Sequence, residues 1–140
     1  MGADAAPATA RPARGQDRLL TRYARLMAER YGARLYLFGS RARGTTGPES
    51  DYDLVAVAES FVGQRRIARA PDRYRLWREA GGFGITLDLH CYTPEEFREE
   101  LAGLGYLGQA RRRRELVEVE PTPSASPRTA AGSTRRTPRT

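Results

Sequence analysis

The sequence predicts an α/β fold, with a small mixed sheet of three to four strands and helices packed on it. Short apolar runs alternate along the chain with amphipathic or polar segments, which is the pattern of strands and helices that share one sheet. Gly- and Pro-containing stretches separate these segments, where turns are expected. The length of 140 residues is typical of one domain.

The first half of this domain is expected to contain a helix and two strands. An amphipathic helix over residues 17–31 is predicted because apolar residues recur at helical spacing, and Gly32 follows as a stop. The apolar run Leu35–Phe38 predicts the first strand, which leads into a turn over Gly39–Gly44 with room for a short helix. Twelve residues then link the first strand to the second, too many for a tight hairpin.

The composition of residues 45–50 predicts a loop, and residues 51–58 predict the second strand. Residues 60–71 stay ambiguous, because their apolar residues are scattered among arginines. A helix over residues 72–80 is predicted next, closed by the pair Gly81-Gly82.

The last part of the domain is expected to contain one more strand and two helices. Residues 85–91 predict the third strand. Thr93 is expected to cap a helix that starts at Pro94, with Glu96 at the capping-box position. A final helix is predicted from Tyr106 to Glu115, before the short apolar pair Leu116-Val117.

The two ends of the chain show no apolar periodicity. Residues 1–15 are mostly Ala, Pro, Arg and Gly, and residues 121–140 are Pro, Ser, Thr, Ala and Arg apart from one Gly. Such segments cannot bury enough apolar surface to fold. The expected organisation is therefore a disordered head at 1–15, a folded domain at 16–120 and a disordered tail at 121–140.

The formal net charge of +7 comes mostly from these ends, so it gives little support to nucleic-acid binding by the folded part. Every basic residue is Arg, which a G+C-rich coding bias explains most simply. No apolar run approaches the length of a membrane span or of a secretory signal. The single cysteine, Cys91, lies in an apolar run, which predicts a buried thiol and a reducing, cytoplasmic setting.

One segment carries most of the functional information. The first strand is followed by Gly39-Ser40 and then by a basic turn with Arg41 and Arg43. Asp51 and Asp53 stand at the start of the second apolar run, two residues apart. Residues two apart in a strand point to the same face, and two carboxylates so close repel each other unless a cation is bound. Mg²⁺ favours one or two carboxylates together with phosphate oxygens and water, so the segment predicts a metal-dependent site for a nucleoside triphosphate.

This pattern, Gly-Ser followed by Ser50-Asp51-x-Asp53-Leu54, resembles the minimal nucleotidyltransferases of the DNA polymerase beta superfamily. That group includes aminoglycoside nucleotidyltransferases and small antitoxins paired with HEPN-domain toxins. The resemblance covers roughly residues 17–118, and it implies a third carboxylate on a neighbouring strand, for which Asp88 is suitably placed. It also implies a polymerase-beta-like fold.

The resemblance implies a catalytic and metal-binding set of Asp51, Asp53 and Asp88, which would hold two Mg²⁺ ions about 4 Å apart. ATP would be the substrate. In this scheme an acceptor hydroxyl attacks the α-phosphorus and releases pyrophosphate. Asp88 would complete the metal that activates the acceptor and could receive its proton.

The nucleotide-binding residues are expected to be Gly39, Ser40, Arg41 and Arg43. Gly39 would let the backbone approach the triphosphate, Ser40 would donate to a phosphate oxygen, and the guanidinium groups would neutralise phosphate charge. The alternative is an ordinary strand-ending turn with solvated arginines.

Other residues keep a structural alternative beside the functional one. The two aspartates Asp51 and Asp53 could be a solvated loop end, and Asp88 a paired core carboxylate. His90 is more often structural than catalytic, and Trp77 is expected to pack a helix rather than to stack on a base. The run Arg111–Arg114 is either a solvated helical face or a docking surface for an acidic partner or RNA.

The sequence is compatible with three functions. The chain could transfer AMP from ATP to a hydroxyl of a protein partner, such as a HEPN-type toxin. It could neutralise such a toxin by contact alone, without catalysis. It could also modify a small molecule of the aminoglycoside kind, although those relatives usually carry an added helical domain for the acceptor.

Overall fold

The computed structural model describes residues 18–43 and 51–121. The head at 1–15, the loop at 45–50 and the tail from residue 122 onward lie outside the described residues.

Four strands form one mixed sheet in the order β3-β2-β1-β4. Strand β1 pairs antiparallel with both β2 and β4, whereas β2 and β3 run parallel. The predicted small mixed sheet is thus confirmed. The strands are β1 (Arg34–Phe38), β2 (Tyr52–Val57), β3 (Leu87–Tyr92) and β4 (Leu116–Val119).

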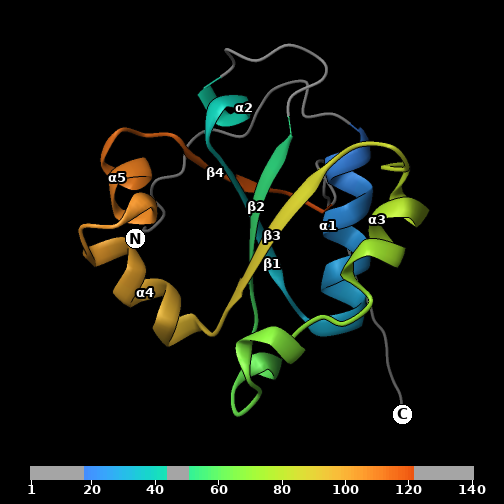
Figure 1. Ribbon diagram of the computed structural model, residues 1–140, viewed down its shortest axis with the longest axis horizontal. Coiled ribbons are helices and arrows are strands. Elements are labelled where there is room, and N and C mark those ends of the chain that lie inside the picture. Colours follow the sequence, from blue (N-terminus) through green and yellow to red (C-terminus); the bar gives the residue numbers. More distant parts are fainter. Residues whose placement is uncertain (1–17, 44–50, 122–140) are drawn as a thin grey trace, which may run out of the picture.

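Helices cover both faces of the sheet (Figure 1). Helices α1 and α3 pack together on one face, and α4 and α5 pack together on the other, while the short α2 follows β1 directly. Two 3₁₀ turns, η2 (Glu59–Phe61) and η3 (Arg66–Ala68), connect β2 to α3. The helices are α1 (Arg18–Tyr31), α2 (Ser40–Arg43), α3 (Arg73–Ala80), α4 (Pro94–Ala102) and α5 (Tyr106–Arg112).

The alternation of side chains along the strands creates two apolar cores. Leu35 and Leu37 of β1 join the core under α1 and α3, whereas Phe38 joins the core under α4 and α5. Trp77 of α3 is buried and packs edge-on against Tyr23, with ring centroids 4.9 Å apart. The prediction that Trp77 packs its helix is therefore confirmed.

Several predicted helices and strands extend beyond the observed ones. Strand β2 begins at Tyr52 rather than Asp51, and β3 begins at Leu87 rather than Ile85. Helix α5 ends at Arg112 rather than Glu115, because the chain reverses at Arg114, whose φ is +61°. The residues after this reversal form β4, an edge strand that the apolar pair alone did not identify.

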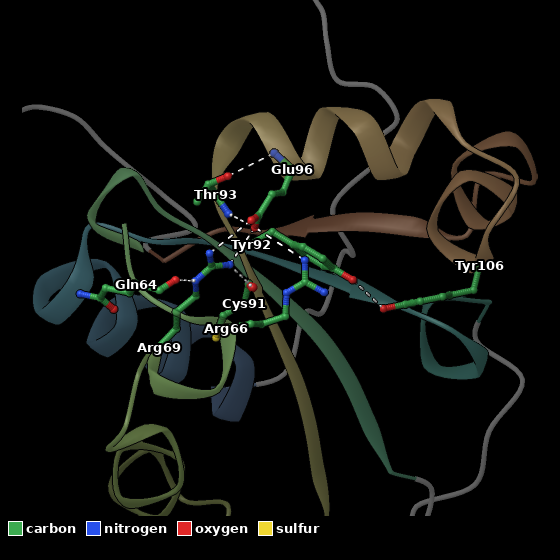
Figure 2. A network of polar contacts seen from close by, with 8 residues as sticks. All are labelled: Gln64, Arg66, Arg69, Cys91, Tyr92, Thr93, Glu96 and Tyr106. Carbon is green, nitrogen blue, oxygen red and sulfur yellow. Dashed lines mark hydrogen bonds and ion pairs between the residues drawn. The ribbon is translucent and has the colours of Figure 1, made fainter. Parts of the chain in front are cut away.

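The start of α4 confirms the predicted capping box. Thr93 Oγ1 accepts a hydrogen bond from the Glu96 backbone N–H, and the Glu96 carboxylate accepts one from the Thr93 N–H. The same carboxylate also accepts two bonds from the buried guanidinium of Arg69 (Figure 2). Arg69 further donates to the Cys91 carbonyl at 3.0 Å, so it ties the segment between β2 and α3 to the end of β3.

Candidate active site

Gly39 forms the turn between β1 and α2. Its φ is +83°, in the left-handed region that favours glycine. Its carbonyl accepts a hydrogen bond from the Ala42 N–H at 3.1 Å, which closes the turn. A Cβ at this position would stand 2.9 Å from Asp53 Oδ2. The backbone conformation and the nearby carboxylate both require glycine here.

The sheet register brings two of the predicted carboxylates side by side. Asp53 of β2 lies opposite Phe38 of β1 on one side and opposite Asp88 of β3 on the other. Neighbouring strands are about 4.8 Å apart, so Asp53 and Asp88 are direct neighbours on one face. Asp51 is exposed and lies one residue before β2, rather than inside the strand as expected.

The carboxylates of Asp51, Asp53 and Asp88 place several negative charges close together. Burial raises the pKa of Asp53, and the negative charges of Asp88 and Asp51 raise it further. His90 opposes the shift, and its Nε2 lies 3.5 Å from Asp88 Oδ1. Asp88 itself is 59% exposed. Asp88 and Asp51 therefore both act on Asp53, and both are open to an incoming molecule.

These side chains suit a hard divalent cation. Carboxylate oxygens are the donors that Mg²⁺ prefers. Burial is the main cause of the raised pKa of Asp53, and a cation between the carboxylates would offset the repulsion from Asp88 and Asp51 that adds to it. Within residues 18–43 and 51–121, however, no three His, Cys, Asp or Glu side chains converge as a ready-made metal shell. Asp53 and Asp88 fit the cation as neighbours, and a complete shell needs further ligands such as phosphate oxygens.

Among the predicted nucleotide-binding residues, the structure places Arg41 against the start of β2. Its Nε donates to the Asp51 carbonyl at 3.3 Å, and its guanidinium lies 3.8 Å above the centroid of the Tyr52 ring. These contacts hold Arg41 next to the Asp51 backbone, over a ring that joins the core under α1 and α3, so its guanidinium lies on the face opposite Asp53 and Asp88. The side chains of Ser40 and Arg43 lie outside what the structure describes.

Aromatic rings border the carboxylates on the same face of the sheet. His90 follows Asp88 by two residues on β3, and Tyr106 at the start of α5 packs against it with ring centroids 5.7 Å apart. The Phe38 ring lies 5.4 Å from the Tyr106 ring. Nothing in the sequence indicates that Tyr106 belongs to this region, because only the packing of α5 on the sheet brings it there.

Two other sequence features lie outside this group. Arg111–Arg114 are exposed, as expected of a solvated face. Cys91 is buried, and burial raises the pKa of its thiol, so the structure supports the structural interpretation of this cysteine. No helix in the described part of the chain is long and apolar enough to cross a bilayer.

Comparison with known proteins identifies a family. The sequence profile described as "Nucleotidyltransferase domain" matches residues 20–121. None of the curated proteins compared with the chain matches it. A crystal structure from Sulfolobus solfataricus, solved at 1.40 Å and named as a candidate nucleotidyltransferase, is similar over 58% of this chain and 69% of that one, with 22% identity and a TM-score of 0.43.

Proposed function

This chain belongs to the nucleotidyltransferase-domain family and is a nucleotidyltransferase, and from this premise we propose that it moves AMP from ATP to a hydroxyl of a protein partner. The observation that carries the proposal is the pairing of Asp53 with Asp88 at the end of the sheet where Gly39 turns the chain. The paired carboxylates are ligands for a divalent cation. The glycine turn beside them lets the backbone come close to a bound triphosphate.

The proposed reaction is a displacement at phosphorus. The acceptor oxygen forms a bond to the α-phosphorus, the bond from that phosphorus to the bridging oxygen breaks, and pyrophosphate leaves. The Gly39 turn and Ser40 would hold the triphosphate, with Arg41 beside them to balance phosphate charge. Asp88, open to solvent and next to Asp53, would orient the acceptor hydroxyl and take its proton.

Mg²⁺ held by Asp51, Asp53 and Asp88 would supply charge neutralisation at the phosphates and polarise the acceptor hydroxyl. Asp53 is the central member of the set, because it borders Gly39, Asp88 and Asp51 at once.

Two observations favour a protein as the acceptor. Asp88 is more than half exposed, so the acceptor must be positioned mainly by what docks around it rather than by walls of this domain. Arg111–Arg114 form an exposed basic stretch at the end of α5, which offers a contact surface for an acidic partner. A HEPN-type protein is the partner that we propose.

The test is transfer of label from ATP carrying ³²P at the α-phosphate, with Mg²⁺ and the product of the adjacent gene. We expect label on that protein with the unmodified chain, and none with Asp53→Asn or Asp88→Asn. Glu99→Gln, an exposed carboxylate on α4, is the matched control and should transfer normally. Retained transfer by Asp53→Asn would overturn the site, and label found only on an added aminoglycoside would overturn the protein acceptor.

A further inference from the structure

We propose that Tyr106 and His90, supported by Phe38, form the surface on which the base of the nucleoside triphosphate stacks. This inference rests on the proposed function and assigns a subsite within it. None of the three residues is a carboxylate or a phosphate ligand, so they would determine how the nucleoside, rather than the triphosphate, is held.

The rings lie within reach of a base whose nucleotide is bound at the carboxylates. The row of residues Phe38, Asp53 and Asp88 crosses three neighbouring strands, and His90 belongs to the next row of the same face. Two residues of strand span about 6.6 Å, and a ribose bridges a comparable distance between its phosphate and its base. A nucleotide with its α-phosphate at the carboxylates can therefore place its base beside His90.

Two of the three rings are exposed to solvent. Tyr106 is 44% exposed and the His90 side chain is 37% exposed, whereas the apolar rings of a finished core are buried. The two ring planes meet at 54°, so neither ring covers the face of the other. Phe38, at 9% exposure, lies against both rings and fixes them from within the core.

Tyr106 is held in place by its hydroxyl. The hydroxyls of Tyr106 and Tyr92 are 3.0 Å apart, and the Arg66 guanidinium lies 4.8 Å over the Tyr92 ring (Figure 2). Burial, followed by the hydrogen bond with Tyr92, raises the pKa of Tyr106. The phenol thus stays protonated and bonded to Tyr92, which suits a rigid stacking platform and not a proton carrier.

A nucleobase is the ligand that fits such a platform. Every base has an aromatic face, and stacking of a base on an aromatic side chain contributes substantially to affinity without requiring specific hydrogen bonds. The imidazole and phenol rings match this chemistry. Because a purine offers a larger face than a pyrimidine, ATP and GTP should bind more tightly than UTP.

The experiment measures binding of two probes by calorimetry with Mg²⁺. One probe is the ATP analogue with a methylene group between the α- and β-phosphorus, which cannot react, and the other is inorganic tripolyphosphate, which has no base. Tyr106→Leu keeps apolar volume but removes the ring, and we expect it to weaken the ATP analogue about tenfold, within the usual range for one stacked base. Tripolyphosphate binding should be unchanged.

Three variants complete the design. Tyr106→Phe keeps the ring but loses the hydroxyl contact with Tyr92, so it should weaken the analogue less than Tyr106→Leu does. His90→Ala should weaken the analogue and spare tripolyphosphate. Tyr74→Leu, which removes an exposed tyrosine from α3 on the opposite face, should change neither.

The outcomes separate this inference from the proposed function. If Tyr106→Leu and His90→Ala bind the analogue normally while the unmodified chain binds and transfers nucleotide, the base lies elsewhere and the inference fails alone. Normal nucleotide affinity combined with a raised KM for the acceptor would mean that the rings hold the acceptor, which also overturns it. An unmodified chain that neither binds nor transfers nucleotide would refute the proposed function instead.

Discussion

Replacing Gly39 with alanine is expected to destabilise the fold by about 1.5–3.5 kcal/mol. Two separate costs contribute. A side chain at a left-handed φ, here +83°, costs about 1–2 kcal/mol. The new Cβ would also stand 2.9 Å from Asp53 Oδ2, and turning that carboxylate away from its preferred rotamer costs about 0.5–1.5 kcal/mol more.

Gly84 provides the matched control for the first cost. Its φ is also +83°, but nothing lies within 4 Å of the Cβ that alanine would add. Gly84→Ala should therefore show the backbone cost alone. The stabilities can be compared by urea or thermal unfolding with a chelator present, where 1 kcal/mol corresponds to about 4–8 °C for a domain of this size.

A double variant isolates the second cost. Asp53→Ala removes the carboxylate, so adding Gly39→Ala to that background should cost no more than Gly84→Ala does. If Gly39→Ala and Gly84→Ala are equally destabilising, and the cost at Gly39 does not change when Asp53 is removed, the close approach between this turn and the carboxylate is wrong.

Three further predictions concern charge and phosphate. Asp53→Asn should unfold at the same or a higher temperature than the unmodified chain at pH 7 without metal. The folded state raises the pKa of Asp53 from 3.8, so the ionised carboxylate destabilises the fold at pH values above its folded pKa. The difference in unfolding temperature between the two proteins should vanish as pH falls below 3.8. A stabilisation that persists at pH 3 would contradict this. Glu96→Gln should lower the free energy of unfolding by about 1.5–3 kcal/mol at neutral pH, since Arg69 holds the pKa of Glu96 at about 2. The stabilisation by the ionised carboxylate is complete above pH 4.5 and is lost as pH falls toward 2. A stability difference that does not shrink in acid would refute the ion pair. Ser40→Ala should weaken binding of ATP with Mg²⁺ by about 1 kcal/mol, and unchanged affinity in calorimetry would mean that the triphosphate lies elsewhere.

Much of the local structure was readable from the sequence because its causes are local. The capping box at Thr93 and Glu96 depends on residues three apart, and the stop of α3 at Gly81 depends on one residue with φ of +111°. The Gly39 turn between an apolar run and two aspartates likewise stands in one short stretch.

Other features depend on contacts between distant parts of the chain. The segment between β2 and α3 shows no clear period, because it is held by Arg69, whose partners Cys91 and Glu96 come much later in the sequence. Strand β4 has only a short apolar signal and exists as an edge because β1 offers it a pairing partner.

For the site, the sequence alone determined the residue types, a glycine turn and carboxylates with the chemistry of a phosphate and cation site. Only the tertiary structure decided that Asp53 and Asp88 stand opposite each other, that the Asp53 carboxylate borders the Cα of Gly39, and that Tyr106 lies beside His90. The physical reason is that side-chain chemistry belongs to each residue, whereas strand register and helix packing are set by burial of the two cores, to which residues throughout the chain contribute.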